Sequence, residues 1–250
     1  MIQVPTKPQL ARLITLIREV AFPEFTAVES GLNSLIEGQL SSVIGCILPD
    51  VAEQKAAAFM EQLGDLTYKL NTDVTAVMEN DPAVVDRGEV ILCYPLTEVM
   101  LHYRTAHALY QLEVPLIPRM LTEIAHSQTG VDIHPAASIG DYFCFDHGTG
   151  IVIGATSIIG SHVVLYQGVT LGAKNFKYDE QGRPLDLPRH PILEDCVTVY
   201  SGTSILGRVR IGHHTVVGGN VWLSHDVPPY SRILQTKATE FPTFTDGAGI

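Results

Sequence analysis

The stretch LEDCVTVYSGTSILGRVRIGHHTVVGGNVWL, residues 193–223, repeats one pattern every six positions. An aliphatic residue returns at 193, 199, 205, 211, 217 and 223, and a small or β-branched residue follows four positions after each of the first five. Six residues that form one short strand and one turn build a triangular prism, because three such units complete one coil. An amphipathic helix cannot keep a period of six. The stretch therefore predicts a parallel β-helix.

The same period extends back to residue 133, with two interruptions. Apolar residues stand at 133, 139 and 145, and again at 153, 159, 165 and 171. Phe145 and Ile153 are eight positions apart instead of six, and the two extra residues lie beside His147. Leu171 and Leu193 are 22 positions apart, and the polar segment between them predicts a loop over 173–190 that leaves the prism. Long excursions from a rigid solenoid commonly carry binding groups.

The first half of the chain follows helical spacing instead. Apolar stripes predict helices over 10–20, 32–47, 73–80, 96–112 and 118–127, and Asp50 with Glu53 forms a capping-box pattern at the start of a further helix. We therefore predict an α+β protein with an α-helical domain over 1–130, a β-helix over 131–229 and a tail over 230–250.

Composition excludes several classes of function. Acidic residues outnumber basic ones 27 to 16, so the formal charge of −11 disfavours a nucleic-acid partner. The four cysteines show no CxxC spacing, so neither a thiolate zinc site nor a redox pair is indicated. No apolar run approaches the ~20 residues of a membrane span, and the N-terminus lacks a signal-peptide pattern. A cytoplasmic enzyme without a membrane partner is expected.

Five motifs resemble those of one family in order and spacing. They are DPAV at 81–84, VDIHPAASIG at 131–140, DHGTGIVIG at 146–154, GVTLGA at 168–173 and PRHPILED at 188–195. Together they resemble the serine O-acetyltransferases from about Asp81 to Pro229. The resemblance implies transfer of acetyl from acetyl-CoA to the L-serine hydroxyl, as the first step of cysteine biosynthesis from serine. It also implies no metal or permanently bound cofactor, a left-handed β-helix, and trimers or hexamers with the active site between neighbouring prisms.

The chemistry requires a base, because a serine hydroxyl is a poor nucleophile at neutral pH. An imidazole suits this role, because its ordinary pKa of about 6.5 leaves much of it neutral. His147 matches the catalytic base of the family, and we expect the two-residue skip to lift its ring out of the coil wall toward the neighbouring subunit. Asp132 matches the family's partner carboxylate, which would hold the ring in the required tautomer and stabilise the imidazolium.

The resemblance also assigns substrate contacts. Arg189 would clamp the serine carboxylate with two parallel hydrogen bonds. Asp81 and Asp146 would take the ammonium and hydroxyl end, with His190 beside them. Acetyl-CoA would contact the backbone around Gly172 and Ala173 and place its phosphates near Lys174, although the loop that follows is longer than in the best-known bacterial members.

Two further partners follow from the family alone. L-cysteine, which resembles serine in shape, is a possible feedback inhibitor. The chain end TFTDGAGI, with Asp246 and Ile250, loosely fits tails whose terminal carboxylate enters O-acetylserine sulfhydrylase.

Alternatives remain open at this point. The same fold could acetylate another small hydroxyl or amine acceptor, or act only as a scaffold through its tail. A γ-type carbonic anhydrase would need three histidine ligands, and His147 and His162 lack its HxxxxH spacing. Structural explanations also exist: Asp132 could cap a turn, Asp81 could end a helix, and Arg189 could tie the loop to the wall.

Overall fold

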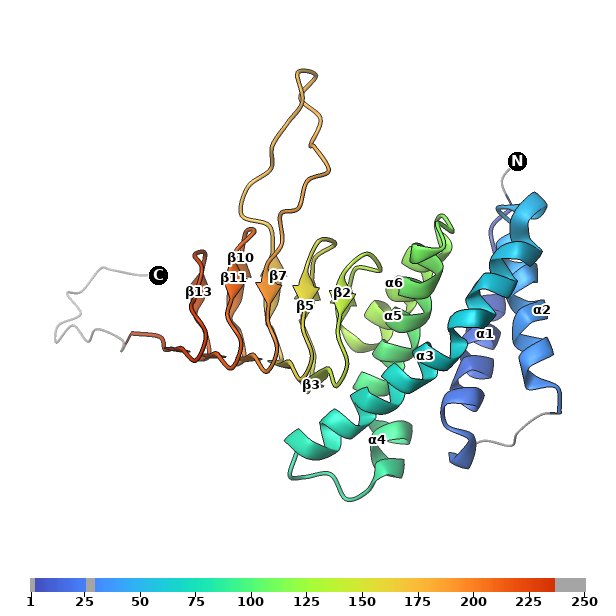
Figure 1. Cartoon of the computed structure of the whole chain (residues 1–250), viewed down its shortest axis with the longest axis horizontal. Helices are drawn as coiled ribbons and strands as arrows, with labels where there is room; N and C mark the ends of the chain where they lie inside the picture. Colours follow the sequence, from blue (N-terminus) through green and yellow to red (C-terminus); the bar gives the residue numbers. More distant parts are fainter. Residues whose placement is uncertain (1–2, 26–29, 237–250) are drawn as a thin grey trace, which may run out of the picture.

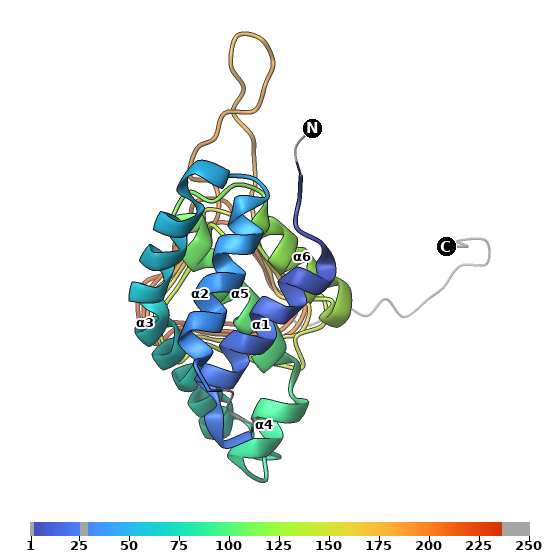
Figure 2. The same cartoon turned by 90° about the vertical axis from the view of Figure 1, so that its right-hand side faces the viewer.

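A computed structural model describes residues 3–25 and 30–236 of the chain. A bundle of α-helices comes first and a prism of short parallel strands follows it (Figure 1). Viewed from the helical end, the bundle covers that end of the prism (Figure 2). The α+β architecture is thus as predicted.

The helices are α1 (Lys7–Ala21), α2 (Leu32–Gly45), α3 (Ala52–Asn80), α4 (Arg87–Cys93), α5 (Pro95–Gln111) and α6 (Ile117–Thr129), with short 3₁₀ turns at Pro23–Phe25 and Pro49–Val51. The segment 73–80 is the last part of the long α3 and not a separate helix. The capping-box prediction was wrong, because Asp50 lies inside a 3₁₀ turn and Val51 precedes α3 without a side-chain cap. The cap of α1 is Thr6, whose hydroxyl accepts from the Gln9 N–H.

The strands form three parallel sheets, one on each face of the prism. The first holds β1 (Asp132–Ile133), β4 (Val152–Ile153), β7 (Thr170–Gly172), β10 (Ser204–Leu206) and β13 (Trp222–Leu223). The second holds β2 (Ser138–Ile139), β5 (Ile158–Ile159), β8 (Ile192–Leu193) and β11 (Arg210–Ile211). The third holds β3 (Cys144–Asp146), β6 (Val164–Tyr166), β9 (Thr198–Val199), β12 (Val216–Val217) and β14 (Arg232–Ile233).

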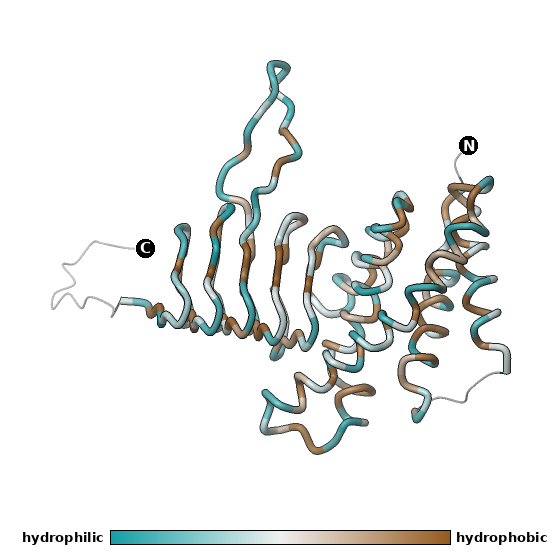
Figure 3. Tube along the Cα trace, in the orientation of Figure 1, coloured by the Kyte–Doolittle hydropathy of each residue, from teal (hydrophilic) through white to brown (hydrophobic). Residues whose placement is uncertain are grey.

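The sixfold period places the core as the sequence predicts. We call the apolar residues that return every six positions the markers. Markers of neighbouring coils stand in register, as in Ile153 beside Leu171 and Leu165 beside Val199. Every marker from Ile133 to Leu223 is buried, and so is each residue four positions after a marker, except at the two interruptions, where Thr149 and Asn175 are exposed. Figure 3 shows the same alternation as brown segments along the coils. Each coil therefore contributes side chains from all three faces to one narrow apolar interior.

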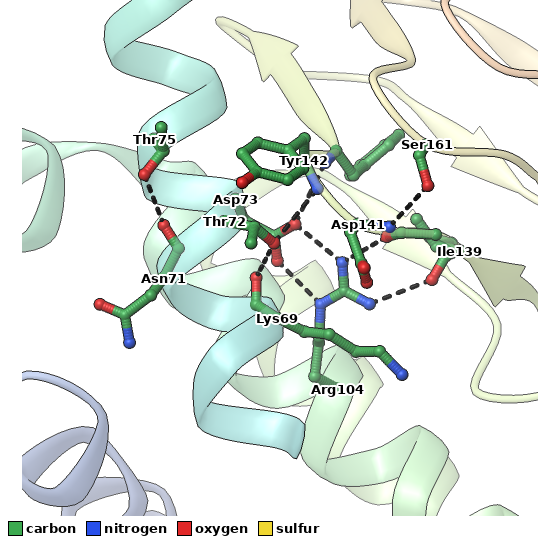
Figure 4. A network of polar contacts seen from close by, with 12 residues as sticks. Lys69, Asn71, Thr72, Asp73, Thr75, Arg104, Ile139, Asp141, Tyr142 and Ser161 are labelled. Carbon is green, nitrogen blue, oxygen red and sulfur yellow. Dashed lines mark hydrogen bonds and ion pairs between the residues drawn. The ribbon is translucent and has the colours of Figure 1, made fainter. Parts of the chain in front are cut away.

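A buried ion pair joins the helices to the first coil. Asp73 of α3 accepts two hydrogen bonds from the Arg104 guanidinium of α5, at 2.8 and 2.7 Å (Figure 4). Arg104 also donates to the carbonyls of Ile139 and Gly140, and Asp73 accepts from the Phe143 N–H. The guanidinium and the carboxylate therefore bind both each other and the backbone of the prism.

Two further predictions concern segments outside the regular coils. The chain leaves the prism between β7 and β8 as a long protrusion, which confirms the loop (Figure 1). The last strand, β14, lies beyond the expected end of the β-helix at 229, and the division into domains stays a prediction. In the part of the chain that the structure describes, every helix is too short or too polar to cross a membrane.

Candidate active site

His147 stands on a bulge at one edge of the prism, where the chain passes from the third sheet to the first. This corner has five residues, 147–151, whereas the equivalent corner of the next coil, between β6 and β7, has three, 167–169. The added residues are His147 and Gly148, which both take a positive φ, of 59° and 85°. A Cβ on Gly148 would lie 2.5 Å from the Phe145 ring, so only glycine fits there. The skip in the period is thus a bulge that carries the histidine.

The bulge turns His147 outward. Its side chain is 72% exposed, and its Nδ1 lies 3.8 Å from the nearer carboxylate oxygen of Asp146. We call this corner, with Asp132, Asp146 and His147, the His147 edge. The imidazole therefore faces the space outside the prism and can meet a ligand there.

Asp132 reaches the same edge from the coil below, because β1 pairs with β4 and the Asp132 N–H donates to Ile151 O at 2.9 Å. Its carboxylate is 3.4 Å from the Arg119 guanidinium of α6, which also pairs with Glu123 at 2.5 Å. Among the described residues no hydrogen bond joins Asp132 to His147. The fold thus brings the two residues to one corner, and their pairing stays a prediction.

Two more expected residues meet beside the bulge. Asp81, at the end of α3, lines a small hollow together with Asp146, Tyr94 and Tyr166. The Tyr94 hydroxyl donates to Asp81 at 2.7 Å, and the Ala83 N–H donates to its other oxygen at 2.8 Å. These bonds, with a smaller contribution from the His147 charge, lower the pKa of Asp81. The hollow therefore presents two carboxylates next to the exposed imidazole.

His190 and Arg189 lie at a different edge, where the loop 173–190 returns from the first sheet to the second. His190 is buried, packs over Gly154 and accepts at Nδ1 from the Thr156 N–H at 3.1 Å. Burial, and next the neighbouring Arg189 charge, lower the pKa of His190 to about 4. His190 is therefore a neutral group at physiological pH.

Arg189 is held by the loop itself. Its guanidinium donates to Asp186 at 3.2 Å and to the carbonyl of Leu187 at 3.3 Å, and it lies 5.9 Å from the centre of the Phe176 ring. We call this corner, with Arg189 and His190, the Arg189 edge. The first sheet separates it from the His147 edge, so one chain does not bring the two groups together.

Comparisons with known proteins agree with this geometry. A serine acetyltransferase of Synechococcus elongatus, described as plasmid, is 44% identical over 205 residues, which are 82% of this chain and 64% of that protein. A serine acetyltransferase of Helicobacter pylori is 39% identical over 175 residues, which are 70% of this chain and 95% of that protein. No protein-family model matches the chain.

Solved structures share the whole architecture. Serine acetyltransferase isoform 3 from Entamoeba histolytica, in complex with cysteine, superposes with a TM-score of 0.81 at 30% identity, over 94% of this chain and 84% of that one. The Neisseria gonorrhoeae serine acetyltransferase in complex with serine gives 0.65 at 27% identity, over 91% and 97%.

This chain belongs to the serine acetyltransferase family. The match nevertheless spans just under two thirds of the Synechococcus relative, as the 64% coverage states.

This serine acetyltransferase homologue has a cationic cavity at the Arg189 edge. The cavity has a volume of about 350 Å³, and four basic residues line it with Phe176, Leu185 and Leu187: Lys174, Lys177, Arg189 and Arg208. Of the three residues expected to contact acetyl-CoA, Lys174 lines the cavity and Gly172 and Ala173 do not; the Gly172 carbonyl accepts from the Gly207 N–H. The chain therefore gathers positive charge here despite its acidic composition.

Sequence reasoning missed several residues of this acetyltransferase fold that touch the expected ones. Arg119 binds Asp132, Tyr94 binds Asp81, and Thr156 and Arg208 bind the backbone or ring of His190. Each lies on an element distant in sequence from its partner, and no local pattern marks it. Asp246 and Ile250 lie outside the described residues.

One group of metal-ligand type occurs in the described ranges 3–25 and 30–236. Glu123, His126 and Asp132 bring their ligand atoms within 4.8 Å of one another, but the Arg119 guanidinium pairs with two of the three. The Arg119 guanidinium therefore already supplies the positive charge among these carboxylates.

Proposed function

We propose that this protein is a serine O-acetyltransferase that moves acetyl from acetyl-CoA to the hydroxyl of L-serine. The main observation behind this proposal is that the His147 imidazole is exposed on a bulge, beside the hollow that Asp81 and Asp146 line. Family membership supports the proposal, as do solved relatives in complex with serine and with cysteine. The product is O-acetylserine, which supplies a cysteine-forming step.

In this mechanism neutral His147 accepts the proton of the serine hydroxyl while the oxygen attacks the thioester carbonyl of acetyl-CoA. The tetrahedral intermediate then collapses, the C–S bond breaks, and the imidazolium returns the proton to the departing CoA sulfur. Asp132 would accept a hydrogen bond from the other ring nitrogen during this cycle. Arg119 contacts one oxygen of the Asp132 carboxylate, and we assign the other oxygen to the hydrogen bond with His147.

The amino-acid substrate carries two opposite charges, which fit the two edges. Asp81 and Asp146 at the His147 edge would bind the ammonium, and Arg189 with His190 would bind the carboxylate. Because the first sheet lies between the edges of one prism, we propose that the Arg189 edge comes from a neighbouring copy of the chain. A trimer of prisms, singly or as a dimer of trimers, satisfies this requirement by cyclic symmetry.

Acetyl-CoA is proposed to enter at the cationic cavity. The clustered basic side chains would attract the phosphates although the net charge of the protein is negative. Phe176 offers a flat apolar surface to the adenine. Lys174 donates to the Ser224 hydroxyl at 3.1 Å, which holds it at the cavity rim.

Two regulatory partners remain proposals that rest on the family. L-cysteine differs from L-serine by sulfur in place of oxygen, so it would fit the same pocket and act as a feedback inhibitor. The terminal carboxylate of Ile250 would bind O-acetylserine sulfhydrylase. Loss of this complex on deletion of the last two residues would support the second proposal.

The test is thiol release from acetyl-CoA with and without L-serine. We expect release that depends on serine, and a loss of at least ~10²-fold in kcat for His147→Ala, because the general base is removed. Gel filtration should show unchanged assembly, since the side chain is 72% exposed and is not part of the prism core.

A matched control is His162→Ala, which removes an exposed histidine at the third corner of the prism, between β5 and β6. This variant should keep its activity. A His147→Ala enzyme that retained most of its turnover would contradict the assignment of the base, and faster release with another hydroxyl or amine acceptor would contradict the assignment of the substrate.

A further inference from the structure

Both carboxylate oxygens of Asp81 are bound. One accepts from the Tyr94 hydroxyl at 2.7 Å and the other from the Ala83 N–H at 2.8 Å. The second bond is local, because Asp81 and Ala83 belong to the same turn. The first is long-range, because it links the end of α3 to the junction of α4 and α5. Asp81 is thus held in one rotamer by a residue from another element.

Tyr94 is itself rigidly placed. It is the single residue between α4 and α5, and Pro95 begins α5. The residue before a proline is restricted to an extended backbone, and Tyr94 has φ −79° and ψ 135°. Its N–H donates to Val90 O and its carbonyl accepts from Thr97 N, both at 3.3 Å. The backbone of Tyr94, from which the side chain extends, is therefore fixed by α4 and α5.

The ring is packed against the hydrophobic core and its hydroxyl points at Asp81 in the hollow that Asp146 also lines. The hydrogen bond to Asp81 raises the pKa of Tyr94 to about 12. The phenol therefore stays protonated, and remains a donor, at physiological pH. A donor of this kind favours the charged carboxylate over the neutral acid.

We propose that Tyr94 is a positioning residue for the amino-acid substrate, which holds the Asp81 carboxylate in the orientation that receives the substrate ammonium. The inference rests on the proposed function, since it assigns to Asp81 the ammonium contact. Asp81 follows a helix end, where a free carboxylate rotates about its own bonds. The Tyr94 hydroxyl removes that freedom before the substrate arrives, and preorganisation of this kind strengthens binding.

The test is Tyr94→Phe, which keeps the ring and its packing and deletes one hydroxyl. We expect KM for L-serine to rise about tenfold, because a hydrogen bond to a charged group is lost. We expect kcat to change less than about twofold, since Tyr94 touches no reacting atom. KM for acetyl-CoA should not change, because neither Tyr94 nor Asp81 lines the cationic cavity. Tyr110→Phe, which removes an exposed hydroxyl from the far end of α5, is the matched control and should change none of these constants.

A double-mutant cycle separates this role from a general structural one. If Tyr94 acts through Asp81, the pair Tyr94→Phe with Asp81→Asn should have the same serine KM as Asp81→Asn alone. An unchanged serine KM in Tyr94→Phe, or effects that multiply in the double variant, would overturn the inference and leave the proposed function standing. An Asp81→Asn enzyme with unchanged serine KM would overturn the assignment of Asp81 and the inference with it.

Discussion

Gly148 decides how His147 is presented. The two residues take positive φ in sequence, which pushes the corner outward and turns the imidazole to the solvent. A side chain at 148 would need both a left-handed backbone and the space that the Phe145 ring occupies. Gly148 is therefore needed for the outward orientation of His147, the proposed base.

We expect Gly148→Ala to lower the free energy of unfolding by about 1–3 kcal/mol, because it combines backbone strain with a clash. It should also reduce kcat, since relief of the clash moves His147. Urea denaturation at a fixed protein concentration measures the first effect. Gly64→Ala is the control, because a Cβ at this helical position in α3 meets nothing within 4 Å, and it should be neutral or stabilising. Equal stabilities of the two variants would contradict this account.

At the scale of elements, the joint between the helices and the prism depends on one ion pair. Arg104 and Asp73 bind each other and three backbone groups of the first coil, and both side chains are buried. This joint also sets the position of α3, whose end carries Asp81. The hollow that Asp81 and Asp146 line is thus built where a helix end meets the first coil.

Arg104→Met should lower the free energy of unfolding by about 3–5 kcal/mol, because it leaves Asp73 buried without a counter-charge. The control is Lys69→Met, which breaks the exposed i,i+4 pair with Asp65 and should cost at most about 1 kcal/mol. Chemical denaturation compares the two. A cost for Arg104→Met no larger than that of the control would mean that the pair does not hold the joint.

At the scale of the whole molecule, the prism separates two half-sites that the chemistry needs together. Under the proposed function, the His147 edge would supply the base and the carboxylates, and the Arg189 edge would supply the cation and the cavity for the cosubstrate. A cyclic assembly places one edge of each prism against the other edge of its neighbour. Activity is therefore expected to depend on assembly.

Subunit mixing tests this directly. His147→Ala and Arg189→Met are each expected to be impaired, but an equal mixture, allowed to exchange subunits, should recover roughly a quarter of wild-type activity, because a quarter of the interfaces then pair two intact half-sites. A mixture of His147→Ala with Asp81→Asn should recover nothing, since both changes lie in one half-site. Absence of recovery in the first mixture would show that one chain supplies both edges.

The sequence alone predicted much of this molecule because its strongest signals are local. A period of six places the same side chains inward in every coil, so the core of the prism, the His147 bulge and the loop all followed from counting positions. The motifs named the family for the same reason, since each is a short contiguous run. The helix stripes were less informative: 73–80 proved to be part of α3, and the Asp50 cap did not form.

Only the tertiary structure decided which distant residues meet. Tyr94 reaches Asp81, Arg119 reaches Asp132, and Arg104 reaches Asp73, each across elements whose packing no periodicity encodes. The structure also decided that Arg189 and His147 stand at different edges of one prism. The physical reason is that a repeat specifies which way a side chain points, inward or outward, whereas its partner is specified by how whole helices and coils pack against one another.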